Sequence, residues 1–308
     1  MTTALITHPA CLRHEPPPGH PERPARLQSI LGALEADAFR PLVRREAPEA
    51  SLDSIARVHD RDYAQEALAS IPSRGVVHFD ADTSVSPGSR DAILRAAGAV
   101  VEGVDMVMKG EVKNAFCAVR PPGHHALPDR AMGFCVFNNV AVGAAHARAV
   151  HGLNRVAVVD FDVHHGNGTE AMFWADPASF YASTHQWPFY PGTGRPGEAR
   201  PEHIVDMPLP AGAGSVEFRK AFSDALLPAL TRFRPDIVFI SAGFDAHQDD
   251  PLGQMRLTEA DYVWATEALC EIAARQCSGR VVSALEGGYD LGALARSVAA
   301  HVQALMAA

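Results

Sequence analysis

Two residues with metal-binding side chains, Asp162 and His164, stand two positions apart after a short apolar run. On an extended segment this spacing points both side chains to the same side, so they can bind one metal ion together. A third ligand is needed, and Asp245 is the best candidate because it follows another apolar run and a glycine. Three protein ligands leave one coordination position for water and substrate, which is typical of a catalytic zinc site. A lone aspartate or histidine is more often structural, so the combination carries this prediction.

A tandem pair of histidines, His124 and His125, follows a Pro-Pro-Gly turn that would hold two imidazoles rigidly. Histidine is the natural general base near neutral pH. Asp160 and Asn167 are the candidate partners for the far nitrogen of each ring. A histidine paired with a carboxylate tends to be cationic, whereas one that faces an amide is better suited to exchange protons.

Three aromatic residues complete the set of candidates. Tyr289 follows two glycines that let the backbone approach the site, and its hydroxyl could polarise a substrate carbonyl opposite the metal. Phe134, which follows Gly133, and Tyr190 could form the walls of a narrow apolar slot. Each aromatic residue taken alone would be interpreted as part of the hydrophobic core.

Short apolar runs precede these polar clusters and predict the elements that position them. The predicted buried strands are residues 115–119, 155–160, 236–241 and 280–285, and Ala-rich segments at 137–150 and 257–275 predict helices. This alternation is typical of a parallel sheet covered by helices. Because ligands bind outside the carboxyl ends of the strands in open α/β sheets, the four clusters are expected to meet at one site.

The composition disfavours several classes of function. The formal net charge of -9 and the pI near 5.9 leave no basic stripe for a phosphate backbone, so nucleic-acid binding is not expected. No stretch approaches the ~20 apolar residues of a membrane span, and five scattered cysteines favour a reducing compartment. We therefore expect one cytoplasmic α/β domain over residues 1–308, whose oligomeric state the sequence does not specify.

At these residues the sequence resembles the zinc-dependent histone deacetylase family, which includes bacterial deacetylase-like amidohydrolases and acetylpolyamine amidohydrolases. The matching segments are residues 19–24, 120–125, 133–135, 160–169 and 191–194, Asp245, and residues 286–289. The resemblance implies an arginase-like α/β fold with an eight-stranded parallel sheet. It also implies that the protein hydrolyses acetylated amines.

The resemblance also implies a role for each candidate residue. Asp162, His164 and Asp245 become the zinc ligands, His125 the general base and acid, His124 its electrostatic partner, Tyr289 the carbonyl-polarising hydroxyl, and Phe134 and Tyr190 the walls of an acyl-lysine tunnel. Asn167 stands where class I enzymes carry aspartate, which places the chain nearer class II. Family members commonly bind structural potassium through backbone carbonyls, here around Asp160, Asp162 and His164, with Ser183 and Thr184 nearby.

Two other functions on the same fold are weighed against this one. A two-metal ureohydrolase would need further carboxylates at positions where this chain has Gly166 and His247. A non-enzymatic reader of acetyl-lysine would be expected to lack a metal ligand, the histidine pair or the tyrosine, and all are present. A metal-dependent deacetylase is therefore favoured, with iron as an alternative to zinc.

The substrate class stays open between an acetylated lysine peptide or protein and an acetylated small amine such as a polyamine. The expected rim residue Leu252 is apolar, which favours acyl-lysine or a broad range, since polyamine deacetylases can carry a glutamate there. Asp82 is a candidate contact for a substrate backbone or amine, although a loop aspartate is more often simply solvated.

Overall fold

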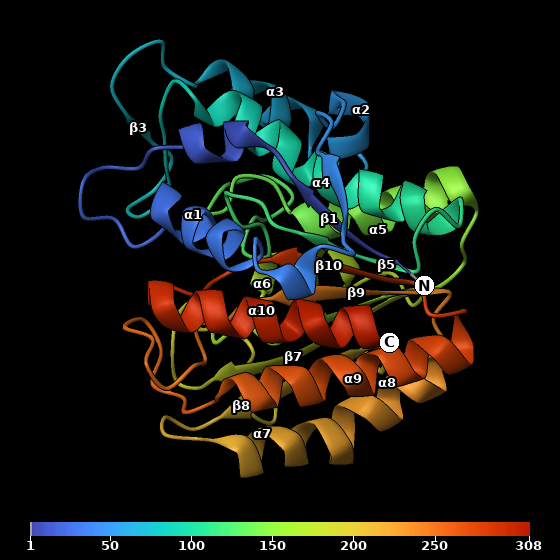
Figure 1. Cartoon of the computed structure of the whole chain (residues 1–308). Helices are drawn as coiled ribbons and strands as arrows, with labels where there is room; N and C mark the ends of the chain where they lie inside the picture. The colour runs from blue at the N-terminus through green and yellow to red at the C-terminus, as the bar shows by residue number, and fades with distance from the viewer. Residues whose placement is uncertain (1) are drawn as a thin grey trace.

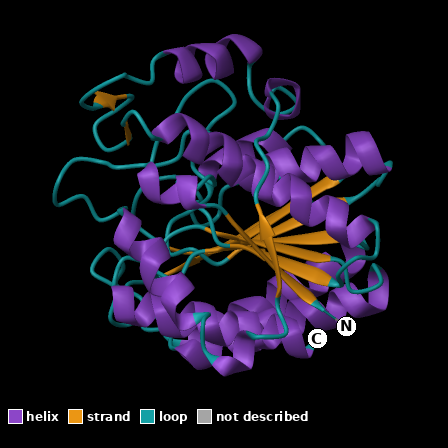
Figure 2. Cartoon of the chain, turned by 45° about the horizontal axis from the view of Figure 1, so that its top comes forward, coloured by secondary structure: helices purple, strands orange, loops and turns teal. Residues whose placement is uncertain are grey.

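A fully parallel sheet of eight strands runs through the centre of the protein (Figure 2). The computed structural model describes residues 2–308. In sheet order the strands are β2 (Val43–Glu46), β1 (Thr3–Thr7), β5 (Asn114–Cys117), β10 (Val281–Leu285), β9 (Ile237–Ala242), β6 (Val156–Asp160), β7 (Ser179–Gln186) and β8 (Ile204–Leu209). The predicted α/β fold with an eight-stranded parallel sheet is confirmed.

The four strands predicted from apolar runs are β5, β6, β9 and β10, and they lie next to one another in the middle of the sheet. Each begins and ends within two residues of the predicted bounds. Every residue in these four strands is buried, because helices cover both faces of the sheet. Continuous apolar runs are therefore the expected signal for this part of the fold.

Helices form a layer on each side of the sheet, as Figure 1 shows. On one side α4 (Ser89–Met108) packs against α5 (Asn139–His151), and on the other α10 (Leu291–Ala307) packs against both α1 (Pro24–Ala33) and α9 (Glu259–Gln276). The helices predicted at 137–150 and 257–275 are α5 and α9. The Asn138 side chain caps the start of α5, and Gly152 ends it in a left-handed conformation with φ 68°.

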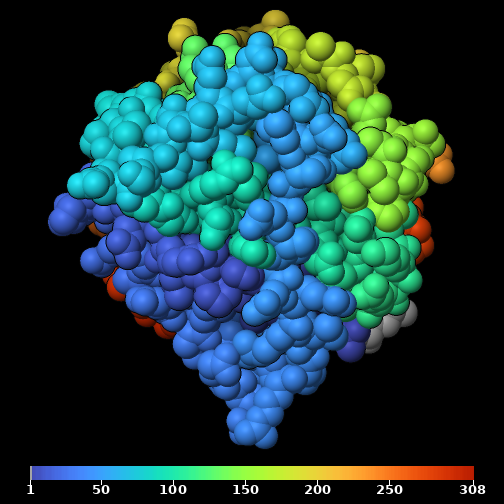
Figure 3. All heavy atoms as spheres, turned by 90° about the horizontal axis from the view of Figure 1, so that it is seen from above, coloured from blue at the N-terminus to red at the C-terminus, as the bar shows by residue number. Residues whose placement is uncertain are grey.

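Shorter elements complete the fold around these layers. They are α2 (Leu52–Ile55), α3 (Arg61–Ala69), α6 (Asn167–Phe173), α7 (Ser215–Ala221), α8 (Leu227–Phe233), the 3₁₀ turns η1 (Pro9–Arg13) and η2 (Asp37–Phe39), the π-helical turn η3 (Phe222–Leu226), and the hairpin of β3 (Val77–His78) and β4 (Ser84–Val85). Seen from above, segments from the first third of the chain occupy the centre and left of that face (Figure 3). No helix within residues 2–308 is long and apolar enough to cross a membrane.

The register of the central strands sets the position of the site. Asp160 at the end of β6 pairs with Ser241 of β9, and Cys117 at the end of β5 pairs with Ala284 of β10. The four strands therefore end at nearly the same level. The loops that follow them emerge side by side at one edge of the sheet, where the polar clusters meet.

Candidate active site

The three candidate metal ligands come together at the carboxyl ends of β6 and β9. His164 Nδ1 lies 3.0 Å from Asp162 Oδ1 and 3.2 Å from Asp245 Oδ2. One ligand atom from each of the three residues lies within 4.8 Å of the others, and all three side chains are buried. We call Asp162, His164 and Asp245 the ligand triad.

Backbone amides fix the orientation of the two carboxylates in the ligand triad. The Val163 N–H donates to Asp245 Oδ1 at 2.8 Å, and the Gly287 N–H donates to Asp162 Oδ2 at 2.8 Å. Asp245 Oδ2 is buried and accepts no hydrogen bond from residues 2–308. A buried carboxylate oxygen without a hydrogen bond is expected to contact a cation, so this atom fits a metal ligand.

The charges of the ligand triad also favour a bound cation. Burial lowers the pKa of His164, but the nearby carboxylates of Asp162 and Asp245 outweigh burial and raise this pKa to about 10. The two buried carboxylates therefore favour a positive charge at the point between the three ligand atoms. Two carboxylate oxygens and one imidazole nitrogen form a ligand set that suits zinc, so the residues present fit the expected ion.

Two glycines let the backbone approach this cluster. A Cβ atom at Gly243 would overlap the Asp162 carboxylate, and one at Gly287 would overlap the carboxylates of both Asp162 and Asp245. Any other residue at either position would therefore displace at least one of these carboxylates. Gly287, one of the two glycines before Tyr289, therefore has a steric reason that the sequence only hinted at.

The histidine pair lies beside the ligand triad, and its two rings have different partners. His124 Nδ1 lies 2.9 Å from Asp160 Oδ2, whereas His125 Nδ1 lies 2.8 Å from Asn167 Oδ1. An amide oxygen only accepts, so His125 Nδ1 carries the hydrogen and its Nε2 keeps a free lone pair. These are the two partners that the sequence analysis named for the pair.

The two imidazoles of the pair are also expected to differ in charge. Burial lowers the pKa of His125, and the positive charges of His124 and His164 lower it further, to well below the usual value for histidine. Burial lowers the pKa of His124 as well, but the carboxylates of Asp160, Asp162 and Glu286 together outweigh burial and hold this pKa well above the usual value. His124 is therefore the charged ring and His125 the neutral one.

A cavity of about 180 Å³ opens onto these residues. Its walls include the five residues predicted to contact substrate, namely Asp82, Gly133, Phe134, Tyr190 and Leu252, together with His124, His125, His164 and Tyr289. Phe189 also lines the cavity and was not predicted; its ring stacks on that of His164 at 5.3 Å. The only signal for Phe189 was its place next to Tyr190.

The comparison with known families decides the assignment. Residues 20–305 match the sequence model of the histone deacetylase domain. The chain belongs to the histone deacetylase family. Among its relatives, a histone deacetylase-like amidohydrolase of Pseudomonas aeruginosa is 39% identical, over 88% of this chain and 73% of that protein.

Two further comparisons extend along nearly the whole of this deacetylase family member. It is 38% identical to the polyamine deacetylase HDAC10 of Homo sapiens, over 99% of this chain and 48% of that protein. The crystal structure of the HDA15 HD domain superposes with a TM-score of 0.93 at 35% identity, covering 99% of this chain and 88% of the other. The fold and family are therefore shared along nearly the whole chain.

In this family member a buried carboxylate that sequence reasoning did not single out anchors the histidine loop. Glu286 Oε2 accepts hydrogen bonds from the backbone N–H groups of Gly123 at 2.7 Å and His124 at 3.1 Å. Burial raises the pKa of Glu286 to about 7. The histidine loop after β5 is thus tied to the glycine loop after β10 through one side chain.

A fully buried ion network supports the glycine loop from the other side. The Glu22 carboxylate binds Arg120 at 2.7 Å and Arg26 at 3.2 Å. Arg26 in turn donates to the Gly288 carbonyl at 2.6 Å, and its guanidinium carbon lies 4.8 Å from the centre of the Tyr289 ring. Glu22 and Arg120 fall in matched segments, but sequence analysis assigned no role to either, because the two residues are 98 positions apart along the chain.

Proposed function

We propose that this protein is a zinc-dependent amidohydrolase that removes acetyl groups from lysine-type amines. The observation that carries the proposal is that His164 of the ligand triad and the neutral His125 border one cavity, with Tyr289 also in its wall. The assignment also follows from the family, whose members include deacetylases and an amidohydrolase. We further propose that residues 1–308 act as one catalytic domain.

His125 has the geometry of a general base. Because Asn167 accepts the hydrogen on Nδ1, the Nε2 lone pair can take a proton from an attacking water and later return one to the leaving amine. When bound to the triad, zinc supplies Lewis-acid polarisation of the substrate carbonyl and lowers the pKa of its water. His124, hydrogen-bonded to Asp160, keeps a positive charge beside the site as negative charge develops.

Tyr289 is assigned the donor to the substrate carbonyl oxygen. Its side chain lines the cavity and is only 8% exposed, so water competes weakly for its hydroxyl. Such a hydrogen bond strengthens as the carbonyl becomes an oxyanion, and it therefore lowers the barrier more than it favours substrate binding. No covalent intermediate is needed, so the buried thiol of Cys135 has no catalytic role in this mechanism.

The cavity walls favour acetyl-lysine as the substrate, with acetylated small amines as the second candidate. Phe134, Tyr190 and Leu252 offer apolar surface to an alkyl chain. Asp82 is the observation that favours the second candidate, because this partly buried carboxylate also lines the cavity and would attract a cationic amine. The relative from Homo sapiens is itself a polyamine deacetylase.

Two further proposals rest on single observations. Asp160 pairs with Ser183 across β6 and β7, and the neighbouring Thr184 hydroxyl is buried without a hydrogen-bond partner among the described residues. These oxygens support a structural potassium ion near the metal ligands Asp162 and His164. All five cysteines are free thiols, which supports the cytoplasm as the compartment.

The decisive experiment compares wild type with Tyr289→Phe on an acetyl-lysine peptide. We expect kcat to fall about 100-fold to 1000-fold, with KM and zinc content nearly unchanged, because only the transition-state donor is lost. The phenylalanine ring retains the packing against Arg26, so the melting temperature serves as the control. Wild-type kcat in this variant would contradict the role of Tyr289, and undiminished turnover in metal-free wild type would contradict the proposed function.

A further inference from the structure

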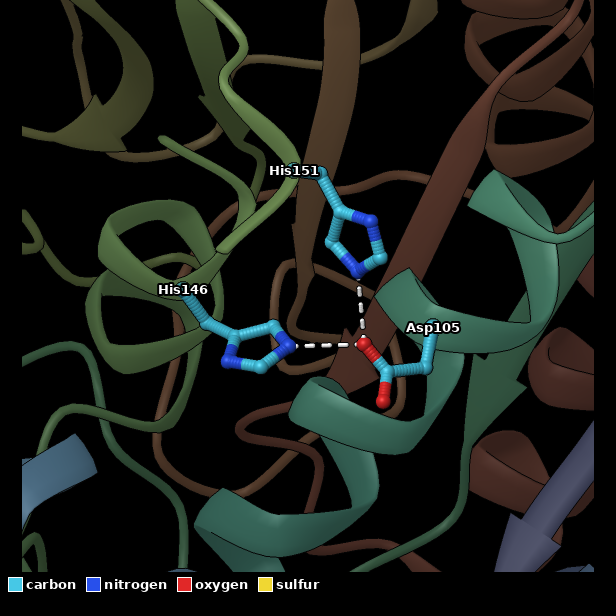
Figure 4. A group of neighbouring side chains, drawn as sticks. All are labelled: Asp105, His146 and His151. Carbon is cyan, nitrogen blue, oxygen red and sulfur yellow. Dashed lines mark hydrogen bonds and ion pairs between the residues drawn. The ribbon is translucent and has the colours of Figure 1, made fainter. Parts of the chain in front are cut away.

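A second cluster of metal-binding side chains lies away from the active site, between α4 and α5. Asp105 comes from α4, and His146 and His151 come from α5 (Figure 4). The nearest ligand atoms of the three residues lie within 4.8 Å of one another. We propose that Asp105, His146 and His151 form a second metal site, which binds a divalent transition ion such as zinc or cobalt.

The geometry that points to an ion is the convergence of two imidazoles on one oxygen. His146 Nε2 and His151 Nε2 each lie 2.7 Å from the same atom, Asp105 Oδ1. Figure 4 shows the two rings approaching this oxygen from different sides. One hydrogen bond would suffice to join the helices, whereas two imidazole nitrogens and a carboxylate around one point are the ligands of a three-residue metal site.

The cluster has room to accept an ion. Ligand atoms around zinc lie about 2.0 to 2.2 Å from the ion, and hence about 3.3 Å from one another, so the nitrogens must retreat from Asp105 Oδ1 by a few tenths of an ångström. The side chain of Asp105 is 24% exposed and that of His151 is 17% exposed, so both can adjust. The same exposure gives an ion a path from solvent and leaves a coordination position for water.

Two cationic side chains contact the cluster, and a bound ion would displace one of them. Arg57 Nη1 lies 3.3 Å from His146 Nδ1, and Lys109 Nζ lies 3.7 Å from Asp105 Oδ2. Because arginine only donates, His146 Nδ1 accepts here and Nε2 carries the hydrogen that points to Asp105. A metal on Nε2 moves this hydrogen to Nδ1, so Arg57, an exposed residue, must turn away.

The test counts bound metal ions in chelator-treated, tag-free protein reloaded with Zn²⁺ and dialysed, with elemental analysis as the readout. We expect two equivalents in wild type and one in His151→Ala. We expect one in Asp245→Ala, which removes the active-site ion, and none in the double variant. His78→Ala, which removes an exposed histidine outside the cluster, is the matched control and should retain two.

The outcomes separate this proposal from the proposed function. Equal zinc content in wild type and His151→Ala would overturn the second site. Equal content in wild type and Asp245→Ala would instead contradict the active-site metal, whatever His151→Ala does.

A second variant tests the second site through affinity and does not depend on how well His151→Ala folds. Arg57→Gln removes the competing donor and offers an amide oxygen to His146 Nδ1–H, so we expect the Kd of this site for Zn²⁺ to fall several-fold, measured by titration in the Asp245→Ala background. If the cluster is only a hydrogen-bonded bridge, Arg57→Gln gains no affinity. A Kd that is unchanged or higher would therefore contradict metal binding through His146 Nε2.

Discussion

Replacement of the fully buried Glu22 by glutamine is expected to destabilise the protein and to slow catalysis together. Glu22 is the acceptor for the guanidinium groups of Arg120 and Arg26, and His14 Nε2 lies 3.5 Å from its carboxylate. Glutamine has nearly the same shape but no charge, and its amide would place a donor against these donors. Two buried guanidinium groups would then lack their counter-charge.

The magnitude follows from the pKa of Glu22 in the folded protein. Burial raises this pKa, but Arg120, then His14 and Arg26, outweigh burial and lower it from 4.5 to about 2. One pKa unit corresponds to about 1.4 kcal/mol, so the ionised carboxylate contributes about 3 kcal/mol at neutral pH. Loss of one partner from a buried ion pair costs about 3–5 kcal/mol, so the two estimates agree.

The sign of the pH dependence is fixed by the direction of this shift. A carboxyl with a lowered pKa stabilises the folded state above its unfolded pKa of 4.5, and this contribution disappears as the pH falls toward about 2. The difference in unfolding free energy between wild type and Glu22→Gln should therefore be about 3 kcal/mol at neutral pH. It should shrink by about half as the pH falls from about 5 to about 3.

Urea unfolding of both proteins across this pH range measures the difference. Asp91→Asn is the control, because Asp91 and Arg13 form an ion pair of 2.7 Å with side chains 46% and 60% exposed, and such pairs contribute about 0.2–1 kcal/mol. Glu22→Gln should also lower kcat, since Arg26 holds the Gly288 carbonyl next to Tyr289. A Glu22→Gln variant as stable as Asp91→Asn, with the pH profile of wild type, would refute the reasoning.

Three further outcomes test the active site. Asp245→Ala should lose the active-site metal ion, measured by elemental analysis, because two remaining ligands are fewer than a catalytic site needs. In single-turnover assays His125→Ala should slow the chemical step more than His124→Ala, because only His125 is assigned proton transfer; the opposite order would exchange their roles. Gly287→Ala should lower metal affinity, measured by titration, because its Cβ would overlap the carboxylates of Asp162 and Asp245; wild-type affinity would argue against a rigid loop.

The sequence predicted the centre of the sheet better than its edges, for a physical reason. Central strands of a parallel sheet are buried on both faces and therefore read as apolar runs, as in β6 and β9. β2 is an edge strand with the sequence Val-Arg-Arg-Glu, and the other edge strand, β8, contains a proline. Charged residues and proline are tolerated in edge strands, where they interrupt the apolar run that would predict a strand.

The strand β7 was not predicted because, although it is buried, many of its residues are polar. It is fully buried, yet Ser179, Ser183, Thr184, His185 and Gln186 are polar. Two of these polar groups are satisfied by contacts that no sequence pattern reveals: His185 Nε2 lies 2.9 Å from the Gly194 carbonyl oxygen, and Gln186 donates to Gln254 at 3.0 Å. A buried polar strand depends on partners from distant segments, and so it cannot be recognised locally.

Separation along the chain also distinguishes the predicted site residues from those that were missed. The partners of the histidine pair, Asp160 and Asn167, lie in the segment that carries two metal ligands, so spacing was enough to suggest them. Glu22 and Arg120 are 98 positions apart, and the fold brings them together beside helix α1, whose Arg26 donates to the Gly288 carbonyl. Such ion pairs become visible only once the topology is known.

The ligand triad and the cluster at Asp105 differ in a way that predicts different uses for an ion. The ligand triad is buried, its His164 borders a cavity, and it lies beside a neutral histidine that can accept a proton. The cluster at Asp105 joins two helices near the surface, and the cations Arg57 and Lys109 contact it. A general base has to be unprotonated at the working pH, and a permanently charged guanidinium cannot accept a proton. An ion bound at Asp105 would therefore stabilise the packing of α4 against α5 without supporting hydrolysis there.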